Sequence, residues 1–542
     1  MHQVVVRRVV TERELQAILE PRDDLVRERR CGDGLFELAD GPFSVWRRTV
    51  RIDPSTGTTT GAQVTVTETF EFRLAVPVWS VLFRPLLRHH LRRGTDPDRG
   101  RVPWWAPPQR LDRRSAKVLG LLSVVALIAG YLGTLLSQTN TFFKEDFGAS
   151  DAAIGATLSV VRIGALLALV VAAVADRRGR RRVLLAASVA GCVATASGTV
   201  APGLVWLGAS QTVARAFSTA MALIFSIIAV EETPAGSRAY AVSVLTMAGA
   251  LGAGAAVMLL WVADLGAGTW RLLYAVPLVA LVPLRWVARH LPETRRFSLS
   301  EQRSSTGPNR PRARLPRGRL ALLAASGLFL SVFVAPASGF QNEYLRSDRG
   351  FSAVGLIAFN ILTNTPGGLG IVVGGRLADA IGRRLIGALG LAAGVGFTVL
   401  VYLDHGWTIW LWSVLAAALG AMAVPALAVY GPELFATEAR GRANGIINLF
   451  SVIGSAAGLY LAGVLADRLG SLSEAMFVLA AAPLVVIALV LLRYPETASL
   501  ELEELNPEDA PLSRDLLALE GLDVDSIAER YPPRTGGPEP DR

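Results

Sequence analysis

The sequence has few charged residues and only two cysteines for a chain of 542 residues. Charged residues make up 18% of it, against about 25% in soluble proteins, whereas 51% is hydrophobic. This composition excludes intrinsic disorder. Cys31 lies near the N-terminus and Cys192 within an apolar run, so the two cannot form a disulfide framework. The apolar sequence must therefore be buried in protein or in lipid.

Motifs typical of an ATP-driven pump or an enzyme are missing. A Walker A loop needs a Gly-Lys pair, but the two lysines, Lys117 and Lys144, follow Ala and Phe. None of the five histidines falls in the middle of an apolar run, and neither a metal-binding cluster nor a nucleophile triad emerges. We therefore expect no enzymatic activity, no cofactor and no metal ion.

Long apolar runs fill the chain between about 115 and 493. A helix needs about 20 apolar residues to cross the ~30 Å hydrocarbon core of a bilayer. Twelve runs of this kind occur, at 116–138, 152–175, 183–201, 204–230, 240–263, 270–290, 320–341, 352–374, 385–403, 407–430, 443–466 and 473–492. The sequence thus predicts an all-α membrane protein with twelve transmembrane helices in the lipid bilayer.

Arginines concentrate in alternate connections between these runs. The connection after the second run holds five arginines between 177 and 182, and those after the sixth and eighth runs are also arginine-rich, whereas the first, third and ninth are poor in cations. By the positive-inside rule, the even-numbered connections and both termini face the cytoplasm. No signal peptide opens the chain, so we expect a multi-pass protein of the cell membrane. The arginines of the short loops account for the net charge of +9, and we expect no nucleic-acid partner.

The second half of the membrane region repeats the first at an offset of 203 residues. Asp176 to Arg181 (DRRGRR) matches Asp379 to Arg384 (DAIGRR), and Pro292-Glu-Thr matches Pro495-Glu-Thr. Six spans followed by six spans give two halves of the same orientation, related by an axis along the membrane normal. A substrate site is then expected between the halves near the midplane.

The regions outside the membrane differ in character. Phe43–Ile52 and Gln63–Val76 alternate as strands of a hairpin, and Trp79–Arg93 reads as an amphipathic helix that lies on the membrane surface or packs on its sheet. We expect five units: a small α+β cytoplasmic domain at 1–114, six-helix bundles at 115–290 and 319–493, a central cytoplasmic loop at 291–318 and an acidic cytoplasmic tail at 494–542.

These motifs resemble the major facilitator superfamily of secondary transporters. Gly375 to Arg384 is similar to the signature loop of that family, although Ala172 replaces the glycine in the first copy. Glu232 to Arg238 and Glu433 to Arg440 resemble the acid–arginine motif of its sugar and metabolite porters, and the Pro-Glu-Thr sequences resemble the motif that closes each half in the same branch. The resemblance covers about residues 115–500.

The resemblance implies a gate of carboxylate–guanidinium pairs that close one state and part in the other. The candidate gating residues are Asp176, Gly179, Arg180, Arg181, Glu232, Arg238, Asp379, Gly382, Arg383, Arg384, Glu433 and Arg440. The alternative is that the arginines only fix topology, which we favour for Arg177, Arg178 and Arg182. Acidic residues have little role in topology, so topology does not explain why these loops contain acidic residues at such positions.

Ionisable and polar residues inside the spans are the candidates for substrate or coupling contacts. Arg215 resembles an arginine found in many proton-coupled members of the family. Both Arg162 and Arg215 could instead snorkel or pair with a helix carbonyl, and polar groups in the spans could join helices rather than line a cavity. The candidates are Arg162, Arg215, Tyr131, Gln138, Asn360, Asn364 and Gln341. Two arginines without obvious acidic partners favour an anionic substrate.

The sequence therefore predicts a monomeric secondary active transporter that is coupled to protons. It would move a small-molecule substrate, a metabolite or a drug, across the cell membrane by alternating access. The other hypothesis is a transporter-like membrane sensor that uses residues 1–114 as its output module.

Overall fold

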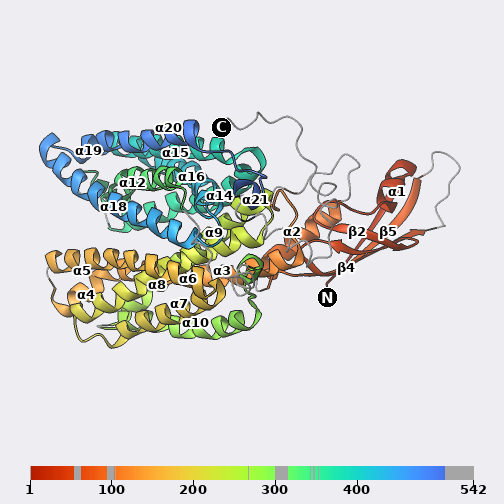
Figure 1. Ribbon diagram of the computed structural model, residues 1–542, viewed down its shortest axis with the longest axis horizontal. Coiled ribbons are helices and arrows are strands. Elements are labelled where there is room, and N and C mark those ends of the chain that lie inside the picture. The colour runs from red at the N-terminus through yellow and green to blue at the C-terminus, as the bar shows by residue number, and fades with distance from the viewer. Residues whose placement is uncertain are drawn as a thin grey trace, which may run out of the picture.

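The computed structural model describes most of the chain. The described residues are 2–53, 63–77, 79–93, 103, 105–149, 151–266, 268–299, 315–341, 344–345, 348–351, 353–506 and 509. Much of the predicted central loop (300–314) and nearly all of the predicted tail after 509 lie outside them. Two helical bundles lie side by side, and a small domain that contains a sheet extends from one end of them (Figure 1).

The N-terminal domain is an antiparallel sheet with two helices. Its strands have the order β1-β5-β4-β3-β2. They are β1 (His2–Thr11), β2 (Arg27–Gly32), β3 (Leu35–Asp40), β4 (Phe43–Asp53) and β5 (Gln63–Leu74), with helices α1 (Glu12–Leu19) and α2 (Ser80–Arg93). The predicted hairpin is β4–β5. Leu87 and Leu91 of α2 lie in one core cluster with Phe70 and Phe72, so α2 packs on its sheet.

The first bundle contains the first six predicted spans. In order these are α3 (Arg113–Gln138), α5 (Asp151–Gly164) continuing into α6 (Ala168–Arg178), α7 (Arg180–Ala196), α8 (Leu204–Glu232), α9 (Arg238–Met258) and α10 (Trp270–His290). A short helix, α4 (Asn140–Phe147), joins the first two spans, and a 3-10 turn at Ala165–Leu167 interrupts the second.

The second bundle repeats this order. Its spans are α12 (Arg317–Gly339), α14 (Ala353–Ile381), α15 (Arg383–Leu403), α16 (Thr408–Ala428), α18 (Arg440–Leu469) and α19 (Leu472–Leu479) continuing into α20 (Ala481–Arg493), with short helices α17 (Tyr430–Glu433) and α21 (Leu502–Leu505). Ten helices of the described chain are long and apolar enough to cross a membrane. The remaining two predicted spans are α5–α6 and α14.

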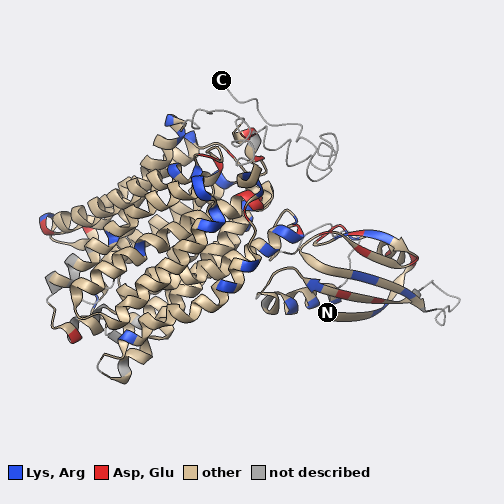
Figure 2. Ribbon diagram, turned by 60° about the horizontal axis from the view of Figure 1, so that its bottom comes forward, with Lys and Arg blue, Asp and Glu red and all other residues tan. Residues whose placement is uncertain are grey.

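The bundles meet where α6 and α14 end and α9 and α18 begin. Charged residues gather at this end, next to the N-terminal domain (Figure 2), and we call it the arginine-rich end. Helix α6 packs against α18, and α14 packs against α9. One buried apolar cluster contains Val230 and Val242 from the first bundle with Ala378 and Val429 from the second. The two halves therefore share a core at this end.

Candidate gate between the two helix bundles

Two aspartates at the arginine-rich end each bind the first turn of a helix in the opposite bundle. The Asp176 carboxylate, at the end of α6, accepts hydrogen bonds from the backbone N–H groups of Gly441 (3.2 Å) and Arg442 (3.1 Å) in α18. The Asp379 carboxylate, near the end of α14, accepts one from the N–H of Tyr240 in α9 (2.8 Å). A helix N-terminus offers unpaired N–H groups and a positive dipole end, so each contact joins the bundles favourably.

An arginine lies one turn after each aspartate and also contacts the opposite bundle. Arg383 pairs with Asp379 at 2.9 Å (Nη2–Oδ1), and Arg180 lies 3.8 Å from Asp176. Arg180 also donates to the carbonyl of Thr437 (2.6 Å), and Arg383 donates to the carbonyl of Ala235 (3.0 Å). Both guanidinium groups are buried. Each arginine therefore binds an acid of its own bundle and the backbone of the other.

Two buried glutamates complete the pairing between the bundles. Glu231, near the end of α8, binds Arg180 of its own bundle and Arg440 of the other. Glu433, at the end of α17, binds Arg383 of its own bundle and Arg238 of the other, the latter at 3.4 Å. Breaking one partner of a buried ion pair leaves an uncompensated charge. These pairs therefore give the contact between bundles a strong preference for being fully formed or fully parted.

One candidate gating residue, Glu232, lies away from the contact between the bundles. It pairs with Arg114 at the start of α3 (2.8 Å) and accepts from the N–H of Arg295. Both partners belong to the first half. Glu231 takes the position in the gate, seven residues before Arg238, just as Glu433 lies seven residues before Arg440. The equal spacing is the signal that identifies Glu231.

The glycines of the two loops turn the chain within each bundle. Gly179 and Gly382 have φ of 96° and 140°, values that favour glycine. A Cβ at Gly179 would lie 2.7 Å from Oε2 of Glu293, and one at Gly382 would lie 2.9 Å from Oε2 of Glu496. These two glutamates are the central residues of the Pro-Glu-Thr motifs, so each motif packs directly on the loop glycine of its own half.

The same glutamates bind the helices that follow the loops. The Glu293 carboxylate accepts from the N–H of Arg181 (3.0 Å), and that of Glu496 accepts from the N–H of Arg384 (3.1 Å). The guanidinium groups of both arginines donate to carbonyls of the last helix in their own half, at 2.6 Å. Four of the candidate gating residues therefore hold each bundle's own end together: Gly179, Gly382, Arg181 and Arg384. Within the part of the chain that the structure describes, they form no hydrogen bond or ion pair across the interface.

The chain after the last span also binds the gate, which the sequence analysis did not predict. The Asp509 carboxylate accepts from Nη2 of Arg440 (3.2 Å) and from the N–H of Thr437 (3.1 Å). Glu501 pairs with Arg238 at 3.3 Å, and the Asn506 amide donates to the carbonyl of Glu433 (2.6 Å). Glu501, Asn506 and Asp509 therefore bind residues of both bundles within the charge network.

The two candidate arginines of the spans lie on two helices of the first bundle that pack against each other, α5 and α8. Arg162, on α5, is exposed, and Arg215, on α8, is half-buried. Arg215 donates to the carbonyl of Gly133 at 2.7 Å. Among the described residues, neither has an acidic side chain within ion-pair distance.

The other predicted site residues are dispersed. The Tyr131 hydroxyl is buried and donates to the carbonyl of Leu273 (2.8 Å), which is a packing role within the first bundle. Asn360 and Asn364 lie one turn apart on α14, and their amides donate to carbonyls of the same helix. Gln138 and Gln341 are half-buried at the ends of α3 and after α12. Among the described residues, no group of three potential metal ligands occurs.

Comparison with known proteins identifies the family. The model of the Major Facilitator Superfamily matches residues 121–368 and 362–520, and the chain belongs to this family of transport proteins. No curated protein matches the chain.

Solved structures show the same fold. The human organic anion transporter MFSD10 (TETRAN) is 16% identical, with a TM-score of 0.59 over 69% of this chain and 99% of that one. The proton:xylose symporter XylE bound to 6-bromo-6-deoxy-D-glucose is 18% identical, with a TM-score of 0.61 over 73% of this chain and 99% of that one.

Proposed function

We propose that this protein is a gradient-driven transporter that carries a small organic anion across the cell membrane by alternating access. The observation that carries the proposal is the pair of ion clusters at the arginine-rich end. In these clusters four arginines contact the opposite bundle: Arg180, Arg238, Arg383 and Arg440. Such a contact has two discrete arrangements, formed and parted, as alternating access requires. Membership of a family of secondary transporters supports the same reading.

The proposed conformation is the one closed toward the cytosol. The positive-inside rule places arginine-rich connections on the cytoplasmic side, and the ion clusters lie at that end. Cys31 is exposed in the N-terminal domain, and Cys192 is buried. A membrane-impermeant maleimide should therefore label the unmodified chain only after cells are permeabilised. Labelling of Cys31 in intact cells would refute this orientation.

The anionic class of the substrate rests on Arg162 and Arg215. Two neighbouring guanidinium groups without a described acidic partner are costly inside a membrane unless they bind an anion. A structural neighbour transports organic anions, which is in keeping with this class. A proton gradient is the proposed driving force, as in the neighbouring symporter.

Transport in proteoliposomes tests the class. A panel of mono- and dicarboxylates is offered under an imposed proton gradient, and counterflow is measured. We expect uptake that Arg215→Ala abolishes and Arg215→Lys partly retains, because Lys keeps the charge but loses the planar fork. The exposed residue Arg289 provides the control variant Arg289→Ala. Transport of only neutral or cationic solutes would refute the anionic class and leave the transporter itself intact.

A further inference from the structure

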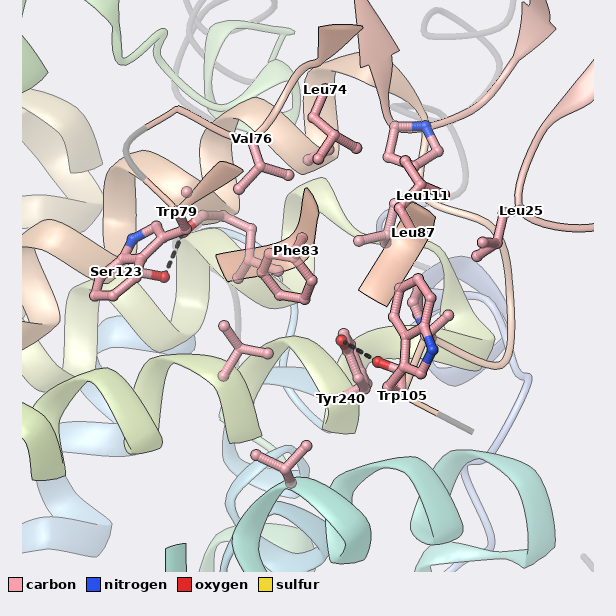
Figure 3. A pocket seen from close by; sticks show the side chains of 18 of the residues that line it. Leu25, Leu74, Val76, Trp79, Phe83, Leu87, Trp105, Leu111, Ser123 and Tyr240 are labelled. Atoms are coloured by element: carbon pink, nitrogen blue, oxygen red, sulfur yellow. Dashed lines mark hydrogen bonds between the residues drawn. The ribbon is translucent and has the colours of Figure 1, made fainter. Parts of the chain in front are cut away.

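A cavity of about 420 Å³ lies at the junction of the N-terminal domain and the two bundles. Its lining is almost entirely apolar and rich in aromatic rings (Figure 3). The walls come from the N-terminal sheet and its loops, from α2 and the segments on either side of it, and from three spanning helices. Among the lining residues are Phe43, Trp79, Phe83, Trp105, Gly120, Met247 and Val372. Volumes of about 300–1,000 Å³ are typical of sites for small molecules.

The spanning helices place this cavity at the depth of lipid chains. Its walls include Ser123 of α3, ten residues from the start of that helix, and Leu251 of α9, thirteen residues from the start. At about 1.5 Å per residue, these positions lie roughly 15–20 Å along the spans. A ligand that fills the cavity must therefore extend into the hydrocarbon region, which suits an acyl chain better than a soluble molecule.

Two cations lie on the spanning helix that forms one wall of the cavity. Arg113 and Lys117 of α3 do not line the cavity, but they are exposed, one turn apart and within two turns of the lining residue Gly120. Neither forms an ion pair with a described acid. Arg110 lines the cavity, and so does Asp24, which is paired with Arg22. Helix α2 has four arginines and no acidic residue, so the balance of charge around the cavity is positive and complementary to a phosphate.

We propose that this cavity binds an anionic phospholipid, with an acyl chain against Trp79, Phe83 and Met247 and the phosphate on Arg113 and Lys117. This site lies outside the transport pathway proposed above, and its occupancy does not depend on the identity or the class of the substrate.

The cavity also connects the lipid to the gate. Met247 of its wall belongs to the first bundle and Val372 to the second, so an occupant touches both. The linker beside it does the same: Arg376 of the second bundle donates to the carbonyl of Pro103 (2.6 Å), and Tyr240 of the first donates to that of Trp105 (3.0 Å). A lipid that fits only when both walls are in place favours the closed gate.

Native mass spectrometry of the purified full chain tests the site. The protein is titrated with phosphatidylglycerol and, separately, with phosphatidylcholine of the same chains. We expect tighter binding of phosphatidylglycerol. In Arg113→Gln/Lys117→Gln, the affinity for phosphatidylglycerol should fall roughly 30-fold and that for phosphatidylcholine little, because each cation contributes a factor of about five. The matched control is Arg285→Gln/Arg289→Gln, two exposed arginines with the same spacing on α10.

Two further measurements distinguish binding of the lipid's acyl chain from binding of its head group. Ala248→Phe and Val373→Phe fill the cavity from opposite bundles, and each should weaken both lipids if the variant keeps the thermal stability of the wild type. Glycerol phosphate, which lacks chains, should not compete. Equal affinity of the wild type for both lipids, an equal loss in the control pair, or full competition by glycerol phosphate would overturn the proposal.

Discussion

The two contacts between the bundles follow one plan but distribute their small residues in opposite ways. In the contact of α14 with α9, the glycine is on α14: a Cβ at Gly375 would lie 2.7 Å from the carbonyl of Ala239. In the contact of α6 with α18, the glycine is on α18: a Cβ at Gly441 would lie 2.6 Å from the carbonyl of Ala172. Each contact has one glycine and one alanine, exchanged between the two helices.

This exchange explains the departure of Ala172 from the family's signature loop. A close approach of two backbones requires a missing side chain on one helix, and it does not matter which helix provides it. The electrostatic parts differ as well: Asp379 lies 2.9 Å from its arginine, and Asp176 lies 3.8 Å from its own. The two halves therefore preserve the same interactions at the interface, although the residue types at equivalent positions differ.

Enlarging either glycine should have the largest effect. A Leu at Gly375 would have to enter space held by Ser243, whose Cβ lies 2.6 Å from the position of the new Cβ, so the bundles could not close. We expect Gly375→Leu and Gly441→Leu to abolish transport in proteoliposomes while the protein still folds and inserts. Gly254→Leu, where no atom lies within 4 Å of an added Cβ, is the control. Full activity of either gate variant would contradict the close contact.

Removing the charge of Glu433 should come next. This residue binds Arg383 and Arg238. Glu433→Gln removes the acid that these two buried cations share and leaves Arg383 only Asp379 and Arg238 only the half-exposed Glu501. Loss of one partner from a buried pair costs about 3–5 kcal/mol. We expect a clearly lower melting temperature together with at least tenfold slower transport. Glu231→Gln should behave alike, and a normal melting temperature in both variants would show that the pairs are not formed.

Double-mutant cycles compare the two pairs that cross the interface. Arg440 lies 2.5 Å from Glu231, whereas Arg238 lies 3.4 Å from Glu433. The coupling energy of the first pair should therefore be the larger, within the range of about 0.5–3 kcal/mol for residues in contact. Thermal unfolding of the single and double Ala variants measures it. A larger coupling energy between Arg238 and Glu433 than between Arg440 and Glu231 would contradict this prediction.

Glu232→Gln should have the smallest effect. Its partner Arg114 is partly exposed, whereas both arginines that bind Glu231 are buried. Water can therefore solvate Arg114 when its partner is lost, so the cost should be smaller than at Glu231. We expect transport within twofold of the wild type and a small change in melting temperature. A loss as large as that of Glu231→Gln would restore Glu232 to the gate.

The sequence predicts the fold and several of the residues that join the two bundles because both depend on local signals. Apolar runs of spanning length give the helices, and Asp176, Arg180 and their repeat mates lie in a recognisable loop. Glu231 was missed because two adjacent glutamates, Glu231 and Glu232, precede Arg238, and only the seven-residue spacing shared with Glu433 and Arg440 distinguishes them. Helix α1 was also missed, although Thr11 and Glu14 form a capping box whose spacing is visible in the sequence.

Other features depend on tertiary structure alone. Glu501, Asn506 and Asp509 are ordinary polar residues of an acidic segment, and only the return of the chain beneath the bundles brings them to the arginines of the gate. Likewise, no pattern shows that the amides of Asn360 and Asn364 donate to their own helix instead of pointing toward a ligand.

The position of Asp509 has a practical consequence for truncated versions of this protein. A nonsense mutation or a proteolytic cut just after Arg493 would leave every spanning helix intact. It would remove Glu496, which binds the loop at Gly382, together with the acids that bind Arg440 and Arg238. Such a fragment should insert into membranes normally but fail to hold the state that is closed toward the cytosol. Its presence in a membrane fraction would therefore not show that it can transport.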